Sequence, residues 1–219
     1  FHFPERLASF SYSIWDSSYA PGNQTSTNTL SFLWVNFVYL LSLVGFSSTI
    51  IERIIYIFFF TGSGLGMFVL LNILLKRYFT DFDKKGLYLA AGTGSLFYMF
   101  NHFTMFMVGF FPPIGVYHLS YVFLPWVFAL FIYNVLIKTT FPSIFLFALS
   151  FWFLLSGNPA NTLGVIALLL FFLLFFIGPI KKSPTKPIKF IIISGLLVIL
   201  LSSYMYLAVF GVGSTPYSY

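Results

Sequence analysis

Uninterrupted apolar runs constrain this chain more than any other feature of its sequence. Leu163–Ile177 and Ile191–Leu201 contain no charged residue and no alternation of apolar with polar positions. The strands of a membrane β-barrel alternate in that way, whereas a helix satisfies its backbone polar groups inside a bilayer without alternation. Charged residues form 7% of the 219-residue chain, against roughly 25% in a soluble domain. The sequence therefore predicts an all-α membrane protein and excludes a soluble enzyme fold.

The apolar runs are numerous enough for a polytopic transmembrane helix bundle with about six spans. Each span needs about 20 apolar residues. We expect residues 54–210 to form the bundle and residues 211–219 to form an external tail. The expected spans are 54–75, 87–108, 116–137, 141–155, 163–180 and 188–210.

The basic residues predict the orientation of the bundle in the cell membrane. Nine of the eleven Lys and Arg residues fall in alternate connections between the predicted spans, and the positive-inside rule assigns such connections to the cytoplasm. The same scattering argues against a nucleic-acid partner, despite the net charge of +6. The nine residues are Lys76, Arg77, Lys84, Lys85, Lys138, Lys181, Lys182, Lys186 and Lys189.

Residues 1–53 are expected to form a long external loop that contains a re-entrant or interfacial helix at 30–46. If 30–46 crossed the bilayer fully, residues 1–29 would lie on the lysine-bearing side, which their polar and nearly uncharged character does not favour. The re-entrant reading also places the glycosylation pattern Asn23-Gln24-Thr25 outside, where such patterns are used.

Three alternate glycines, Gly62, Gly64 and Gly66, superficially resemble a phosphate-binding loop. They lie inside a predicted span, without a preceding strand or a following Lys. Gly62 and Gly66 have the small-xxx-small spacing that lets helices approach closely in lipid, and Ala90 and Gly94 repeat it. We therefore interpret both pairs as helix-packing faces.

Two carboxylates in the external loop are candidate catalytic bases, because a half-desolvated carboxylate can take a proton from an alcohol. They are Asp16 and Glu5, in a loop rich in Tyr, Trp, Asn and Ser, which stack on and hydrogen-bond sugars. The structural alternatives are a turn or cap for Asp16, and a local ion pair with Arg6 for Glu5.

Two histidines, His102 and His118, lie in the outer parts of their predicted spans, and ionisable residues in membranes often mark sites. The alternative is a neutral imidazole satisfied by a neighbouring helix or a headgroup. Arg53 adjoins the outer end of a predicted span beside Glu52, where pairing also explains it. The chain has no Cys, and two histidines without nearby carboxylates are only a weak signal for a metal, so no metal ligands are assigned.

In the order of its elements, the chain resembles the polytopic GT-C glycosyltransferases, especially YfhO-like membrane proteins. The resemblance covers about residues 1–210, with Pro125-Trp126 in the reverse of the usual Trp-x-Pro order. Its motifs are Pro4, Trp15-Asp16, Pro21-Gly22-Asn23, Gly64-Leu65-Gly66-Met67, Lys76-Arg77, Ala90-Ala91-Gly92-Thr93-Gly94, Pro125-Trp126 and Gly157-Asn158-Pro159.

The resemblance implies an inverting glycosyltransferase that uses a polyprenyl-phosphate-linked sugar at the outer membrane face. It implies Asp16 or Glu5 as the base, and leaves a divalent cation open as cofactor. The contacts to the substrate would come from Arg6, Arg53, His102, His118 and Trp15. Because the first span and the downstream part of the family pattern have no counterpart, we expect a fragment, and the family's acid often precedes the position of Phe1.

The rival hypothesis is a non-catalytic structural subunit of a larger membrane assembly, with neighbouring subunits as partners beside membrane lipid. Low charge and small-residue faces suit it equally well. A transporter ranks last, because only Asn101–His102 resembles a site near the middle of the membrane.

Overall fold

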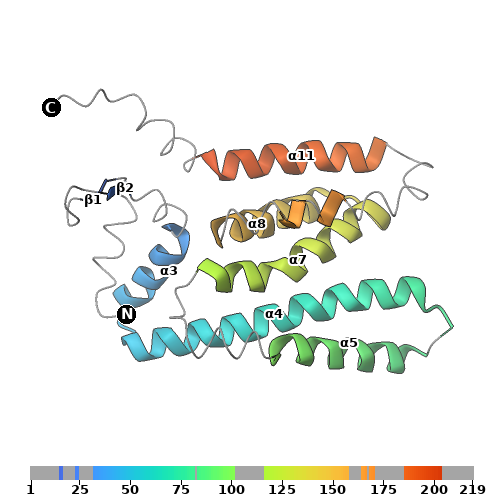
Figure 1. Cartoon of the computed structure of the whole chain (residues 1–219), viewed down its shortest axis with the longest axis horizontal. Coiled ribbons are helices and arrows are strands. Elements are labelled where there is room, and N and C mark those ends of the chain that lie inside the picture. The colour runs from blue at the N-terminus through green and yellow to red at the C-terminus, as the bar shows by residue number, and fades with distance from the viewer. Residues whose placement is uncertain are drawn as a thin grey trace. The chain divides into compact units, whose positions relative to one another are not determined.

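The computed structural model describes residues 15–16, 23–24, 32–81, 83–101, 116–157, 164–166, 168–170 and 185–203. These residues are helical apart from one pair of two-residue strands and short turns, so the all-α prediction is confirmed (Figure 1). The elements are β1 (Trp15–Asp16), β2 (Asn23–Gln24), α3 (Phe32–Leu43), α4 (Ser48–Tyr78), α5 (Lys84–Met99), α7 (Val116–Leu136), α8 (Phe141–Gly157) and α11 (Thr185–Leu201).

Among the described residues, two stretches of helix are long and apolar enough to cross a membrane: Ser48–Tyr78 and Leu119–Leu136. Phe141–Leu155 is a shorter apolar helix. A bundle of six spans therefore stays a prediction.

The chain divides into two compact units, the first comprising Phe1–Tyr56 and Leu200–Tyr219 and the second Ile57–Ile199. In the first unit, β1 and β2 pair antiparallel, with Trp15 opposite Gln24 and Asp16 opposite Asn23. The chain leaves α3 through Gly45, whose φ of 96° is in the left-handed region that glycine adopts without strain. Helix α4 begins three residues later.

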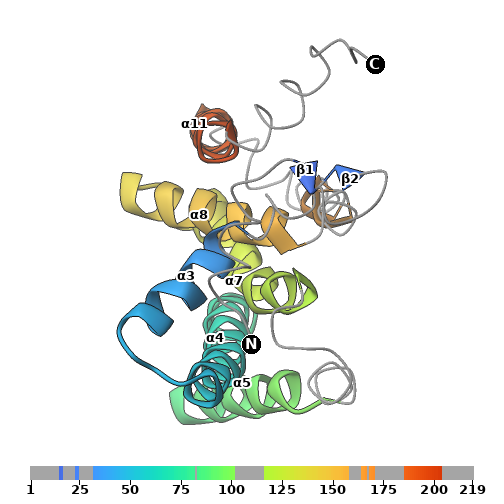
Figure 2. The same cartoon turned by 90° about the vertical axis from the view of Figure 1, so that its left-hand side faces the viewer.

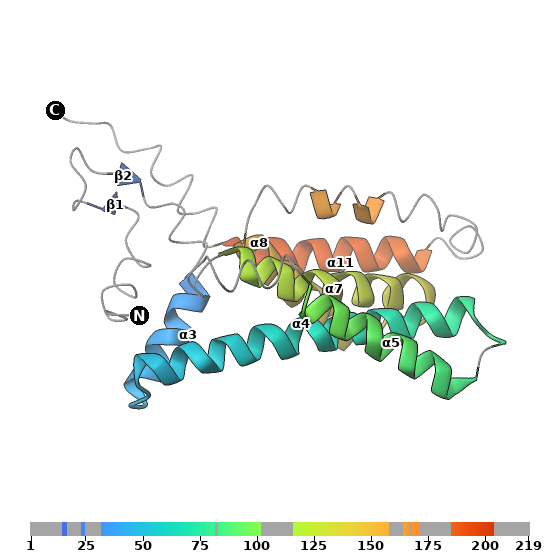
Figure 3. The ribbon, with the colours of Figure 1, turned by 60° about the horizontal axis from the view of Figure 1, so that its bottom comes forward.

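The helices of the second unit lie in the order α5, α4, α7, α8, α11, as two perpendicular views agree (Figures 1 and 2). Figure 3 shows α4 and α5 joined as a hairpin. At the start of α5, the Asp83 carboxylate accepts a hydrogen bond from the Gly86 N–H at 3.0 Å, which satisfies one of the free donors of the first turn.

An aromatic cluster joins α7, α8 and α11. Phe190 of α11 is fully buried, and its ring lies edge-on to Phe147 and Phe131 at centroid separations of 5.0 and 5.9 Å. Phe147 also contacts Phe151 at 5.8 Å. The interlocked rings fill this interface with side-chain volume.

A glycine seam, formed by Gly62, Gly64 and Gly66 of α4, packs against α5 and α7. A methyl group at Gly62 would lie 3.0 Å from Val122, and one at Gly66 would lie 2.7 Å from the ring of Trp126. The packing interpretation of Gly62 and Gly66 is confirmed. In the second pair, Gly94 faces Leu71 closely, but Ala90 is exposed.

Candidate functional site

The structure describes only part of the site predicted from the sequence. Glu5, Arg6 and His102 lie outside the described residues. Trp15 and Asp16 form β1, so the described backbone puts the candidate base in a strand. The roles of all five residues stay predictions.

Two further candidates lie on helices. Arg53 is an exposed residue near the start of α4, and His118 lies in the first turn of α7. Arg53 belongs to the first unit and His118 to the second. Their proposed contacts with substrate therefore also stay predictions.

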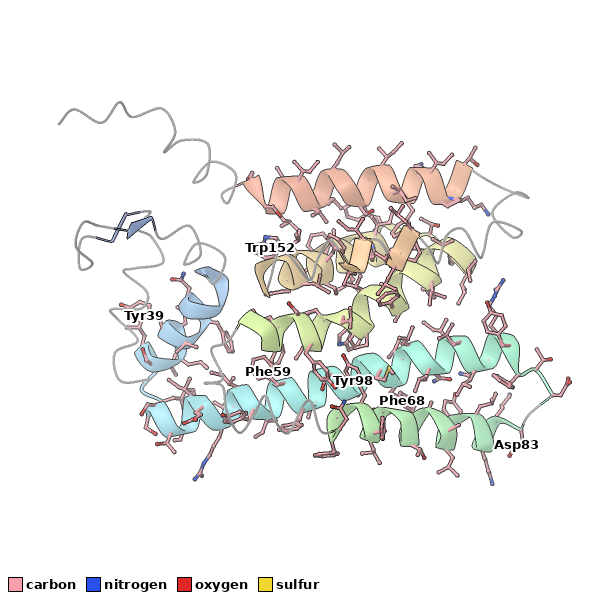
Figure 4. All side chains as sticks on the ribbon, in the orientation of Figure 1. Tyr39, Phe59, Phe68, Asp83, Tyr98 and Trp152 are labelled. Carbon is pink, nitrogen blue, oxygen red and sulfur yellow. The ribbon has the colours of Figure 1, made fainter. Side chains whose placement is uncertain are left out.

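One polar cluster of the second unit is a tyrosine clasp, which we define as Tyr98, Asn101 and Tyr121. The rings of Tyr98 and Tyr121 stack at a centroid separation of 4.3 Å with an interplanar angle of 5°. Figure 4 shows Tyr98 at the end of α5 away from Asp83. The clasp thus joins the last turn of α5 to α7.

Pro125 inside α7 explains the hydrogen bond that Tyr98 donates. Pro125 has no N–H, so the carbonyl of Tyr121, four residues earlier, loses its partner within the helix. The hydroxyl of Tyr98 donates to this carbonyl at 2.9 Å. A neighbouring helix therefore satisfies the backbone group that the proline leaves free, as an apolar environment requires.

The end of α5 explains the hydrogen bonds that the Tyr98 carbonyl accepts. The last carbonyls of a helix have no partner within it, and α5 ends at Met99. The carbonyl of Tyr98 accepts from the Tyr121 hydroxyl at 2.5 Å and from Asn101 Nδ2 at 2.9 Å. Asn101 Nδ2 also donates to the Tyr121 hydroxyl at 2.7 Å. Neither tyrosine is among the candidates predicted from the sequence, although Pro125 within an apolar run indicates a carbonyl that needs a donor.

The hydrogen bonds of the clasp join protein groups to one another, so the clasp is a structural connection between two helices. It lies beside two predicted site residues in the sequence, because His102 follows Asn101 and His118 precedes Tyr121 by three residues. Its chemical contribution to a site would be to fix these neighbouring segments.

The described basic residues of the second unit gather at the end away from the clasp. They lie in the last turn of α4, the first turns of α5 and α11, and the turn after α7, and these helix ends share the right-hand end of Figure 1. Helix α7 runs 15 positions from Tyr121 to Leu136, or ~22 Å along its axis, before the turn that carries Lys138. The described part of the unit thus has a basic end and, away from it, the uncharged clasp.

A cavity of about 640 Å³ opens at the basic end, between the α7–α8 turn and the start of α11. From the sequence alone, the lysines of this cavity indicate only the orientation of the chain in the membrane. Among the residues that the structure describes, no three His, Cys, Asp or Glu side chains gather as a metal site, so the divalent cation stays an open prediction.

No family model, curated protein or solved structure matches the chain.

Proposed function

We propose that the chain is an integral protein of the cell membrane, with its basic end in the cytoplasm and residues 1–53 outside. The observation that carries this proposal is the separation of the basic helix ends from the uncharged tyrosine clasp. About 22 Å of helix α7 separates them, which is a large part of a hydrocarbon core of about 30 Å. Large apolar side chains such as Leu89 and Phe97, which are 73% and 76% exposed, suit contact with lipid.

Within this membrane protein, we propose a GT-C-like transferase that takes a sugar from a polyprenyl-phosphate-linked donor at the outer face. The support is the order of motifs along the sequence. Asp16 or Glu5 would take the acceptor's proton, and Trp15 would stack on the sugar. Arg6, Arg53, His102 and His118 would contact the donor phosphate.

A non-catalytic subunit is the second proposal, and one observation favours it. The polar groups of the tyrosine clasp bond to each other and to helix carbonyls, which is typical of a scaffold. In this proposal the exposed apolar side chains contact neighbouring subunits as well as lipid.

Single cysteines test the orientation, because the chain has none of its own. An impermeant maleimide should label Asn23→Cys in intact cells, and Lys85→Cys only after the membrane is permeabilised. The reverse result would overturn the proposed sidedness.

Turnover of the donor tests the transferase. Membranes containing the full chain should convert a radiolabelled polyprenyl-phosphate sugar to the free polyprenyl phosphate, and Asp16→Asn or Glu5→Gln should abolish the conversion. Asp81→Asn, the same change in the turn between α4 and α5, should leave it unaltered. Equal rates in all three variants would remove the proposed base, and no turnover by the folded chain would favour the subunit.

A further inference from the structure

The cavity at the basic end collects three lysines from two distant parts of the chain. Lys138 comes from the α7–α8 turn, and Lys186 and Lys189 come from the first turns of α11, about fifty positions later. Orientation in the membrane requires only that basic residues lie on one side. Their convergence on one cavity is an additional feature.

No acidic residue is among the described residues that line the cavity, and the sequence contains no Asp or Glu after Asp83. Helix α11 has no acidic residue in its first turn either. Lysines at a helix N-terminus add to the positive end of its dipole, where an anion is the favourable occupant.

The wall of the cavity that carries Lys138 is held by a buried network. The side chain of Asn134 is 2% exposed and accepts a hydrogen bond from Ser143 Oγ at 2.7 Å. Its amide donates to the Leu130 carbonyl at 2.8 Å, and its backbone carbonyl accepts from Thr139 Oγ1 at 2.8 Å. Thr140 and Ser143 bond to one another across the first turn of α8. The turn that carries Lys138 is therefore held by hydrogen bonds within the protein.

The rest of the lining is apolar, with Phe141, Ile144 and Ile193 beside the polar groups. A free phosphate ion gains no favourable contact from apolar side chains, whereas a phospholipid has both a phosphate group and hydrocarbon chains. Basic pockets between helices on the cytoplasmic side of a membrane are suited to anionic headgroups.

We propose that this cavity binds an anionic phospholipid, with its phosphate among Lys138, Lys186 and Lys189 and its acyl chains along Phe141, Ile144 and Ile193. The proposal rests on the membrane placement proposed above, and is independent of transferase activity.

The test is native mass spectrometry of the full chain released from mixed micelles that contain phosphatidylglycerol and phosphatidylcholine. The chain should retain phosphatidylglycerol selectively. The triple variant Lys138→Gln, Lys186→Gln, Lys189→Gln should lose at least about tenfold in retention, since each lysine near an anionic headgroup contributes roughly fivefold. The matched control, Arg77→Gln, Lys84→Gln, Lys85→Gln, removes the same charge from the same end and should lose less than about threefold.

A second variant, Ile193→Trp, fills the cavity without a change of charge and should also lower retention if the triple variant does not fold. Excess inorganic phosphate should not displace the lipid. Equal losses in the two triple variants, equal retention of both lipids, or displacement by inorganic phosphate would each overturn the proposal. Donor turnover is measured separately, so failure of the lipid site is distinguishable from failure of the transferase.

Discussion

Helix α7 has two interfaces that are built on opposite principles. Toward α4, Trp126 and Val122 meet the glycine seam, where the absence of side chains allows close backbone approach. Toward α8 and α11, Phe131 belongs to the aromatic cluster, where interlocked rings fill the space. One face of this apolar helix thus packs against small residues, and the other packs against large ones. We therefore expect added atoms to destabilise the first interface and removed atoms to destabilise the second.

The largest expected effect comes from emptying the aromatic cluster. Phe190→Ala removes a fully buried ring that touches Phe131 and Phe147, and should lower the free energy of unfolding by ~3–5 kcal/mol through the cavity that remains. Detergent-denaturation curves measure it. Ile192→Ala, at a 56% exposed position of the same helix, should change stability by less than ~0.5 kcal/mol. A similar loss in both variants would show that the cluster is not the source.

Adding a single methyl group should damage the seam. Gly66→Ala places Cβ 2.7 Å from the Trp126 ring and 3.1 Å from Pro125, so we expect a loss of ~1–3 kcal/mol from overpacking. Gly92→Ala is the matched control, because its Cβ would meet nothing within 4 Å and alanine favours a helix by ~0.5–1 kcal/mol. A loss of stability in Gly66→Ala together with a gain in Gly92→Ala would support close packing at the seam. A gain of stability in both variants would refute it.

A hydrogen bond across the seam should contribute less. Trp126 Nε1 donates to the Gly62 carbonyl at 2.9 Å, and Trp126→Phe keeps a ring there while removing the donor. Bonds between membrane helices average ~0.6 kcal/mol, so the expected loss is on that order. Ser95→Ala, which removes the 2.6 Å bond to the Gly64 carbonyl, should give a similar loss. Losses above those of Gly66→Ala would mean that polar contacts, and not close approach, hold the seam.

The smallest effect is expected at the surface of the α4–α5 hairpin. Lys76 Nζ donates to the Tyr88 hydroxyl at 3.1 Å and lies 4.7 Å from the ring centroid. Tyr88→Phe should produce no resolvable change in stability, because exposed charge contacts are screened by water and salt. A loss that grows at low ionic strength would contradict this expectation.

The helical class and the packing role of Gly62 and Gly66 could be predicted because both depend on local sequence. Apolar runs marked the helices but not their ends: α4 extends from Ser48 to Tyr78, beyond the predicted 54–75. Hydropathy reports which part of a helix suits lipid, whereas backbone hydrogen bonds continue into the polar residues on either side.

The clasp and the lysine cavity could not be predicted, because each depends on which helices become neighbours. Tyr98 and Tyr121 are 23 positions apart, and no local pattern pairs them. Lys138 and Lys186 have the same sequence signature whether they are scattered over a surface or brought to one cavity. The strand pair β1–β2 could not be predicted either. Its strands are only two residues long and lie in a turn-rich segment, so they leave no alternating pattern in the sequence.

Pro125 and Tyr98 form an epistatic unit. The tyrosine hydroxyl serves a carbonyl that only a proline four residues downstream exposes, so each substitution changes the consequence of the other. In a Pro125→Ala variant, the N–H of residue 125 can donate to the Tyr121 carbonyl within α7. We therefore expect Tyr98→Phe to lower stability less in that variant than in the natural chain.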